Sequence, residues 1–193
     1  MKTKSLLFSL LMLVSFSAFA QEPAQNVKKY GFKSAIVKTV TDMMGQKIES
    51  LGYIDNYGAL EIQKVAIDVP GMGKMETGVL NRDGKSWQIN YTMKQIEESP
   101  VEEQVNFLNL TDEDIKKYNI KEIGKETIMD KECTKYTMEN EVQGIKAMVT
   151  SWVYKGLAVK TVSEVQGIKI EATVTEFQED VMVLPQMFDI PKF

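Results

Sequence analysis

The chain of 193 residues contains no histidine and only one cysteine, Cys133. Most catalytic triads and most zinc or copper centres require one of these two residue types. A single cysteine cannot form an internal disulfide, so the fold has to be held together by its apolar core. The sequence also contains no Gly-x-Ser-x-Gly elbow, phosphate-binding loop or dinucleotide fingerprint. We therefore expect a protein that is not an enzyme and that uses no cofactor.

The remaining candidates for metal binding are better explained as local structure. Met72 and Met75 could offer thioethers to Cu(I), but such a site needs three or four methionines, and Gly71-Met72-Gly73 is typical of a turn. The acids Asp112–Asp114 lack the twelve-residue loop of a calcium site and fit the first turn of a helix. The sequence therefore predicts no metal site.

Cys133 has two interpretations. It is either a small buried residue within a strand, which we favour, or an exposed thiol that pairs between chains. A nucleophilic role is disfavoured because no histidine is present to convert the thiol into a thiolate.

The basic residues are scattered as singles and pairs, and the formal net charge is −4. Nucleic-acid binding requires a clustered basic face, so nucleic acid is excluded as a partner.

The first twenty residues have the organisation of a cleaved signal peptide. Lys2 and Lys4 precede an apolar run from Leu6 to Phe16, and Ala18-Phe19-Ala20 offers the small-x-small cleavage pattern. The run is shorter than the ~20 residues needed to span a bilayer. The absence of a cysteine near the cut argues against a lipid anchor. We therefore predict that residues 1–20 are removed and that the protein is exported to the periplasm, with at most transient membrane contact.

Downstream of the cut we expect a flexible lead-in over residues 21–30 and a single domain over residues 31–193. Glycine-containing turns divide this domain into long strand-like runs, and Asp83-Gly84 is a strong hairpin signal. The predicted strands are Phe32–Met43, Lys47–Asn56, Ala59–Val69, Lys74–Asn81, Lys85–Met93, Glu122–Ile128, Glu132–Asn140, Ile145–Tyr154, Leu157–Val165 and Ile168–Gln178. The hexapeptide Glu141–Lys146 recurs as Glu164–Lys169, which predicts the same turn in two hairpins of one meander.

Two short helices are predicted between the strand-rich halves. Ser99-Pro100-Val101-Glu102 has the pattern of a capping box that opens a helix to about Asn109. Thr111 offers a second cap, followed by acids in the first turn and Lys116-Lys117 in the last.

The strand lengths suggest a curled sheet. Ten or eleven residues at about 3.3 Å each span roughly 35 Å, and accumulated twist prevents many such strands from staying flat. We predict a mainly β (α+β) fold in which long antiparallel strands form an open half-barrel, with the short helical pair in its concavity. A fully closed barrel is the alternative.

Several turn and aromatic motifs resemble those of the outer-membrane lipoprotein carrier superfamily, and of an exported Gram-negative branch of it. The motifs are Tyr53-Ile54-Asp55-Asn56-Tyr57-Gly58, Gly124-Lys125-Glu126-Thr127-Ile128, Trp152-Val153-Tyr154-Lys155-Gly156-Leu157 and Met187-Phe188-Asp189-Ile190-Pro191. The resemblance covers most of the chain after the signal peptide. It implies an incomplete antiparallel barrel with inserted helices and an apolar cavity that accepts acyl chains.

The sequence favours a non-catalytic binding protein that holds a lipid, an acyl chain or another apolar small molecule. Ten of the twelve methionines follow the predicted cleavage site, and flexible methionines suit an adaptable pocket. The predicted cavity-lining residues are Trp87, Tyr91, Met93, Met148, Trp152 and Tyr154. The alternative is an envelope protein-interaction module that uses an exposed sheet edge or apolar patch to hold a protein partner.

Overall fold

The computed structural model describes residues 28–69, 71, 73–100, 105–142 and 145–193. The predicted signal peptide, most of the lead-in, Met72 and the Gln143-Gly144 turn lie outside the described residues.

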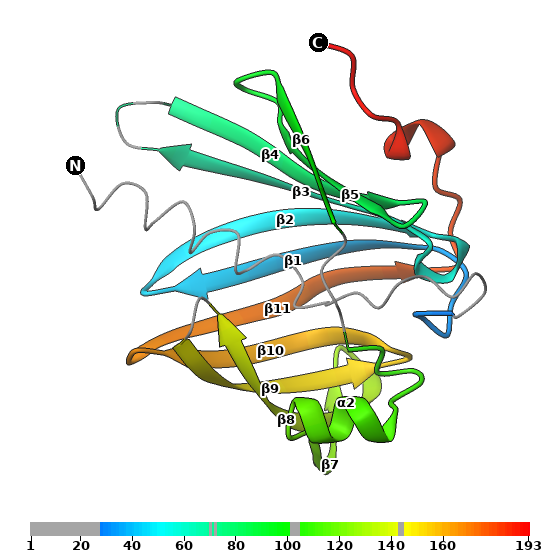
Figure 1. The fold of residues 1–193 in the computed structure, drawn as a ribbon, viewed down its shortest axis with the longest axis vertical. Coiled ribbons are helices and arrows are strands. Elements are labelled where there is room, and N and C mark those ends of the chain that lie inside the picture. The colour runs from blue at the N-terminus through cyan, green and yellow to red at the C-terminus, as the bar shows by residue number, and fades with distance from the viewer. Residues whose placement is uncertain (1–27, 70, 72, 101–104, 143–144) are drawn as a thin grey trace.

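The described residues form one antiparallel sheet of eleven strands that does not close (Figure 1). The strand order is β6-β5-β4-β3-β2-β1-β11-β10-β9-β8-β7, so β6 and β7 are the two edges. The bounds are β1 Ala35–Met43, β2 Gln46–Asp55, β3 Leu60–Val69, β4 Gly73–Arg82, β5 Lys85–Asn90, β6 Gln95–Pro100, β7 Lys121–Ile128, β8 Lys131–Val142, β9 Ile145–Tyr154, β10 Leu157–Val165 and β11 Ile168–Glu179. The mainly β, open architecture is thus confirmed, and the closed barrel is wrong.

All ten predicted strands are present with ends within three residues of the prediction, because short turns set most of their limits. Asp83 and Gly84 both have positive φ, and so do Gln166 and Gly167, as the favoured hairpin turns require. The two copies of the hexapeptide close two hairpins of the same sheet, since Val142 pairs with Ile145 and Val165 pairs with Ile168. The repeated hexapeptide therefore reflects the same kind of turn in two hairpins of one sheet.

The predicted helix from Ser99 to Asn109 is wrong. Ser99 and Pro100 instead end the edge strand β6, where Ser99 pairs with Ser86 of β5. A proline is tolerated at this position because an edge strand has backbone groups that need no partner. Cross-strand pairing has overridden the local capping signal. Residues 101–104 lie outside the described range, and residues 105–110 form loop and turn.

The second predicted helix is confirmed as α2, Asp112–Lys117, with Thr111 and Asp114 forming the capping box. It does not act as a plug, because no residue of α2 is buried. Residues of the neighbouring loops make the apolar contacts instead. Together with side chains of β8 and β9 they form what we call the margin cluster. Its members are Val105, Phe107, Leu110, Tyr118, Ile120, Tyr136, Met138 and Val149.

Two larger clusters form the rest of the core. The central cluster consists of Tyr30, Phe32, Ala35, Val37, Ile54, Cys133, Trp152, Leu157, Val159 and Val174. In the C-terminal cluster, residues that follow β11 cover β3–β5; its buried members are Ile62, Leu80, Trp87, Ile89, Val183 and Phe188.

Residues 28–34, which precede β1, tie several turns together. Lys29 donates from its backbone nitrogen to the carbonyl of Tyr57, and Gly31 donates to the carbonyl of Lys155. The Lys29 ammonium also contacts the Glu61 carboxylate at 2.6 Å. This segment therefore joins the β2–β3 connection to the β9–β10 turn.

Candidate functional site

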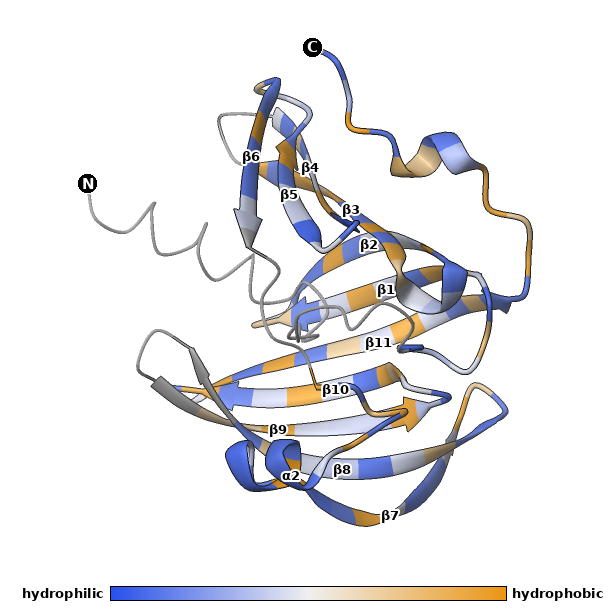
Figure 2. Ribbon diagram, turned by 45° about the vertical axis from the view of Figure 1, so that its right-hand side comes forward, coloured by the Kyte–Doolittle hydropathy of each residue, from blue (hydrophilic) through white to orange (hydrophobic). Residues whose placement is uncertain are grey.

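The five central strands β2, β1, β11, β10 and β9 have two chemically different faces. In a strand, successive side chains point to opposite faces, and residues directly opposite on neighbouring strands share a face. Ala35, Val37, Thr39, Thr41 and Met43 of β1 are all buried and define what we call the neutral face. Figure 2 shows the alternation of hydrophobic and hydrophilic residues along β1 and β11.

The neutral face carries almost no charge. Among the described residues that the register places on it in these five strands, the only charged one is Glu179, opposite Ala35 at the end of β11. The reverse side, which we call the charged face, has many acids and lysines, including Lys38, Asp42, Lys47, Glu49, Lys160, Glu171 and Glu176.

Small side chains form the middle of the neutral face. One row of directly paired residues crosses six strands in the order Ile48, Thr41, Ala172, Thr161, Ser151 and Tyr136. Its four inner members are small, with larger side chains at the two ends. Thr41 and Ser151 are only 2% and 3% exposed. The middle of the neutral face therefore carries short, uncharged side chains.

Thr39 lies in the adjacent row, between Ser50 of β2 and Val174 of β11. It is 8% exposed, and its Oγ1 is the one buried side-chain oxygen or nitrogen without a hydrogen-bond partner in the described part of the chain. The register between β1 and β11 shifts between Lys38 and Thr39, so a β-bulge lies directly beside this residue. Bulges are frequent next to functional sites because they re-aim side chains.

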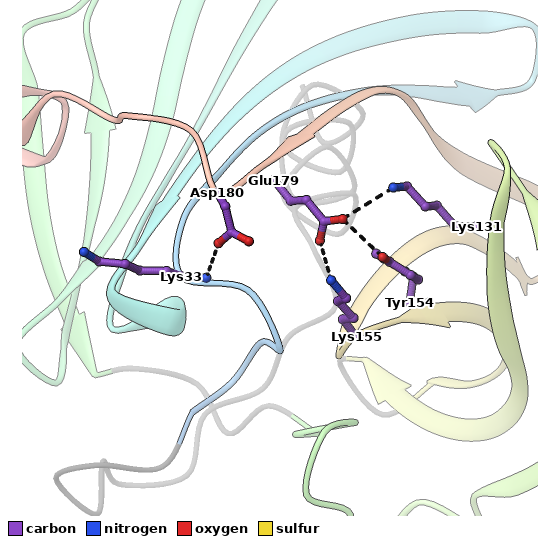
Figure 3. Close-up of polar contacts among 6 residues, drawn as sticks. All are labelled: Lys33, Lys131, Tyr154, Lys155, Glu179 and Asp180. Atoms are coloured by element: carbon purple, nitrogen blue, oxygen red, sulfur yellow. Dashed lines mark hydrogen bonds and ion pairs between the residues drawn. The ribbon is translucent and has the colours of Figure 1, made fainter.

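The one charge on the neutral face is fully compensated (Figure 3). The Glu179 carboxylate accepts hydrogen bonds from Lys155 at 2.8 Å, from the Tyr154 hydroxyl at 3.2 Å and from Lys131 at 3.4 Å. Burial alone would raise the pKa of Glu179, but these donors outweigh it and hold the pKa below its ordinary value. The adjacent Asp180 accepts from the Lys33 backbone nitrogen at 2.9 Å. Glu179 therefore links the end of β11 to the β9–β10 turn and to the start of β8.

On the charged face, Trp152 lies between two lysines. The ammonium groups of Lys135 and Lys160 are 4.6 and 5.2 Å from its ring centroid, and its indole nitrogen donates to Glu126 at 2.7 Å. The aliphatic parts of the two lysines and their cation–π contacts cover the ring. Trp152 is therefore only 8% exposed although it lies on a polar face.

Glu171 on the same face should make stability sensitive to acid. Hydrogen bonds from Lys160 and Lys169 lower its pKa from 4.5 to about 2. Because the folded-state pKa is depressed, this stabilisation is complete above about pH 4.5 and is lost as the pH falls towards 2. We expect Glu171→Gln to reduce the acid-induced loss of stability in this range, measured by urea unfolding at several pH values. Glu49→Gln is the control, because Glu49 is 68% exposed and 3.9 Å from its lysine. Equal pH profiles for the wild type and Glu171→Gln would contradict the prediction.

The structure does not bring the six predicted cavity residues together. Trp87 and Tyr91 belong to the C-terminal cluster, whereas Trp152 and Tyr154 belong to the central cluster. Met93 and Met148 are 47% and 54% exposed. Whether any of the six contacts a ligand stays a prediction.

The residues in the middle of the neutral face give little signal in the sequence because they are small. A signal was present in β1, where Ala35, Val37, Thr39, Thr41 and Met43 alternate with Ile36, Lys38, Val40 and Asp42.

Other features of the described residues give no second site. Cys133 is buried within β8, which confirms the favoured interpretation, and burial raises the pKa of its thiol. The described ranges contain no group of three or more histidine, cysteine or acidic side chains placed to hold a metal. Within the same ranges, the helices are too short and polar to cross a bilayer.

Comparison with known proteins identifies the fold. No protein-family model matches the chain, and no curated protein does. Among solved structures, the chain is similar to an uncharacterised conserved protein from Thermus thermophilus, with 13% identity, coverage of 86% of this chain and 90% of that chain, and a TM-score of 0.55. It is also similar to LprF from Mycobacterium bovis, with 10% identity, coverage of 81% and 90%, and a TM-score of 0.42.

A third similar structure is an outer membrane lipoprotein-sorting protein domain from Vibrio parahaemolyticus, with 11% identity, coverage of 82% and 90%, and a TM-score of 0.35. At these identities the likeness concerns the fold alone.

Proposed function

We propose that the protein is an exported, non-catalytic binding protein that holds a lipid, an acyl chain or a similar apolar molecule against the neutral face. The observation that carries the proposal is the near absence of charge on this face of the five central strands, among the residues that the structure describes. Export rests on the signal-peptide pattern of residues 1–20, and amino-terminal sequencing of the processed protein tests it.

The chemistry of the neutral face suits an apolar chain. A hydrocarbon chain gains about 0.8 kcal/mol for each methylene that leaves water, provided that it meets no unpaired charge. Thr41, Ala172, Thr161 and Ser151 carry short, uncharged side chains, which suit the close approach of an apolar chain to the sheet. Ile48 and Tyr136 border this row at its two ends.

The alternative, a protein partner that adds a strand to the sheet, is less well supported. The edge strand β7 is almost entirely exposed, but it carries Lys121 and Lys125 and a register shift before Gly124. The other edge, β6, carries Glu97 and Glu98 and ends at Pro100. Charges, bulges and proline are the features by which proteins prevent strand addition at an edge.

Filling the small-residue row should abolish binding. We expect Ala172→Phe to weaken the binding of N-phenyl-1-naphthylamine, an uncharged fluorescent probe, at least tenfold. The added ring would take the place of two or three methylenes, each worth about 0.8 kcal/mol. Fluorescence titration of purified protein freed of copurifying lipid measures the affinity.

The matched control is Thr173→Phe, one residue along β11 and therefore on the charged face. It should leave the affinity for the probe unchanged. Absence of binding to the wild-type protein, together with an empty protein in native mass spectrometry, would rule out the proposed function. Equal weakening by both variants would show that the probe does not occupy the neutral face.

A further inference from the structure

We infer that the Thr39 hydroxyl is a hydrogen-bonding anchor for an uncharged polar group of the bound molecule, so that the protein selects neutral acyl esters over free fatty acids. This inference deepens the proposed function and rests on it. Two independent observations carry it: the unpartnered, buried Thr39 hydroxyl and the lack of unpaired charge around it.

The first observation is that Thr39 differs from two other buried hydroxyl residues, Ser50 and Ser34. Ser50 Oγ, directly opposite, accepts a hydrogen bond from the Gln63 amide at 3.0 Å, and Ser34 Oγ donates to the Val181 carbonyl at 2.6 Å. Thr39 Oγ1 has no such partner in the described part of the chain, although the residue is more than nine-tenths buried.

A buried hydroxyl without a partner is costly, typically by about 1–3 kcal/mol. Valine has almost the same shape as threonine and would avoid this cost in the middle of a strand. The register places the Thr39 side chain on the same face as Ser50 and Val174, and the β-bulge begins at this residue. We therefore assign its missing partner to a molecule bound on the neutral face.

The second observation limits the chemistry of that partner. The only charged residue of the neutral face, among those described, is Glu179, an anion whose carboxylate is already bound by Lys131, Tyr154 and Lys155. A second carboxylate or a phosphate at Thr39 would therefore be a buried charge without a counter-ion. An ester carbonyl, an amide or a hydroxyl satisfies the threonine without bringing a charge.

The test is displacement of N-phenyl-1-naphthylamine by two ligands that share one acyl chain. At pH 8, below their critical micelle concentrations, 1-monooleoylglycerol should displace the probe at a concentration at least tenfold lower than oleate. Thr39→Val should weaken the binding of 1-monooleoylglycerol about three- to tenfold, the usual effect of one hydrogen bond, and leave the affinity for the probe unchanged. Thr173→Val, on the charged face of β11, is the matched control and should change neither affinity.

A stability measurement keeps the test independent of ligand binding. Because the hydroxyl has no partner within the described part of the chain, Thr39→Val should keep or raise the melting temperature of the ligand-free protein. A lower melting temperature would show that the hydroxyl is satisfied within the fold, and it would overturn the inference.

The outcomes separate the two proposals. Failure of the wild-type protein to bind the probe would contradict the proposed function and the inference with it. Probe binding combined with equal or stronger displacement by oleate, or with no loss for Thr39→Val, would overturn the inference and leave the proposed function standing.

Discussion

Replacing Phe32 with alanine is expected to lower the free energy of unfolding by about 3–5 kcal/mol, the usual cost of removing a fully buried ring. Phe32 is 1% exposed. Its ring stacks on Tyr30 at 5.1 Å between centroids and meets the edge of Phe177 at 5.4 Å. It therefore anchors residues 28–34 to the central cluster from outside the sheet.

Phe32→Ala should lower the free energy of unfolding by more than the contacts of the Phe32 side chain alone contribute. The same segment buries Tyr30, whose hydroxyl has a pKa raised well above its ordinary value, mainly by burial and further by the Glu61 carboxylate. Loss of Phe32 should loosen Tyr30 and the Lys29–Glu61 ion pair together. Urea unfolding of the variant measures the change. Phe193→Ala is the control, because Phe193 is 52% exposed and should change stability by no more than about 0.5 kcal/mol. A loss below about 1 kcal/mol for Phe32→Ala would show that residues 28–34 contribute little to the fold.

The strands could be predicted because their determinants are local. Alternating side chains, and turns such as Asp83-Gly84 that require positive φ, define each hairpin within about ten residues of sequence. The edge strand β6 could not be found in this way. Its sequence, Gln95–Pro100, has one apolar residue that faces a partner, Ile96 opposite Ile89, and its last residues imitate a helix start. Pairing with β5 decides its conformation, and pairing is not a local property.

The neutral face could not be identified from the sequence, for a physical reason. Residue type does not indicate the face of the sheet: Trp152 is a large apolar residue, yet it lies on the charged face, covered by Lys135 and Lys160. Which face a residue occupies depends on register and on bulges. The shift between Lys38 and Thr39 is visible only when β1 and β11 are aligned, although they are more than a hundred residues apart in sequence.

Replacing Phe188 with alanine is expected to cost about 3–5 kcal/mol as well, but through a different part of the sheet. Phe188 is 2% exposed and ends the short helical turn η2, Pro185–Phe188, which follows β11. It packs in the C-terminal cluster with Leu80 and Trp87, and Arg82 donates to its carbonyl at 3.3 Å. The substitution should release residues that follow β11 from the face of β3–β5.

Tryptophan fluorescence can separate the two large effects, because the chain has two tryptophans and each lies in a different cluster. In a Trp152→Phe background, Phe188→Ala should shift the emission of Trp87 to longer wavelength before global unfolding, whereas Phe32→Ala should not. Met182→Ala is the control, since Met182 is 87% exposed on the same segment.

Because Phe32 and Phe188 share no packing partners, the losses of stability caused by Phe32→Ala and Phe188→Ala should add to within about 0.5 kcal/mol in the double variant. A coupling energy above about 1 kcal/mol would contradict this prediction. It would mean that residues 28–34 and the residues that follow β11 fold as one unit although their contacts are separate.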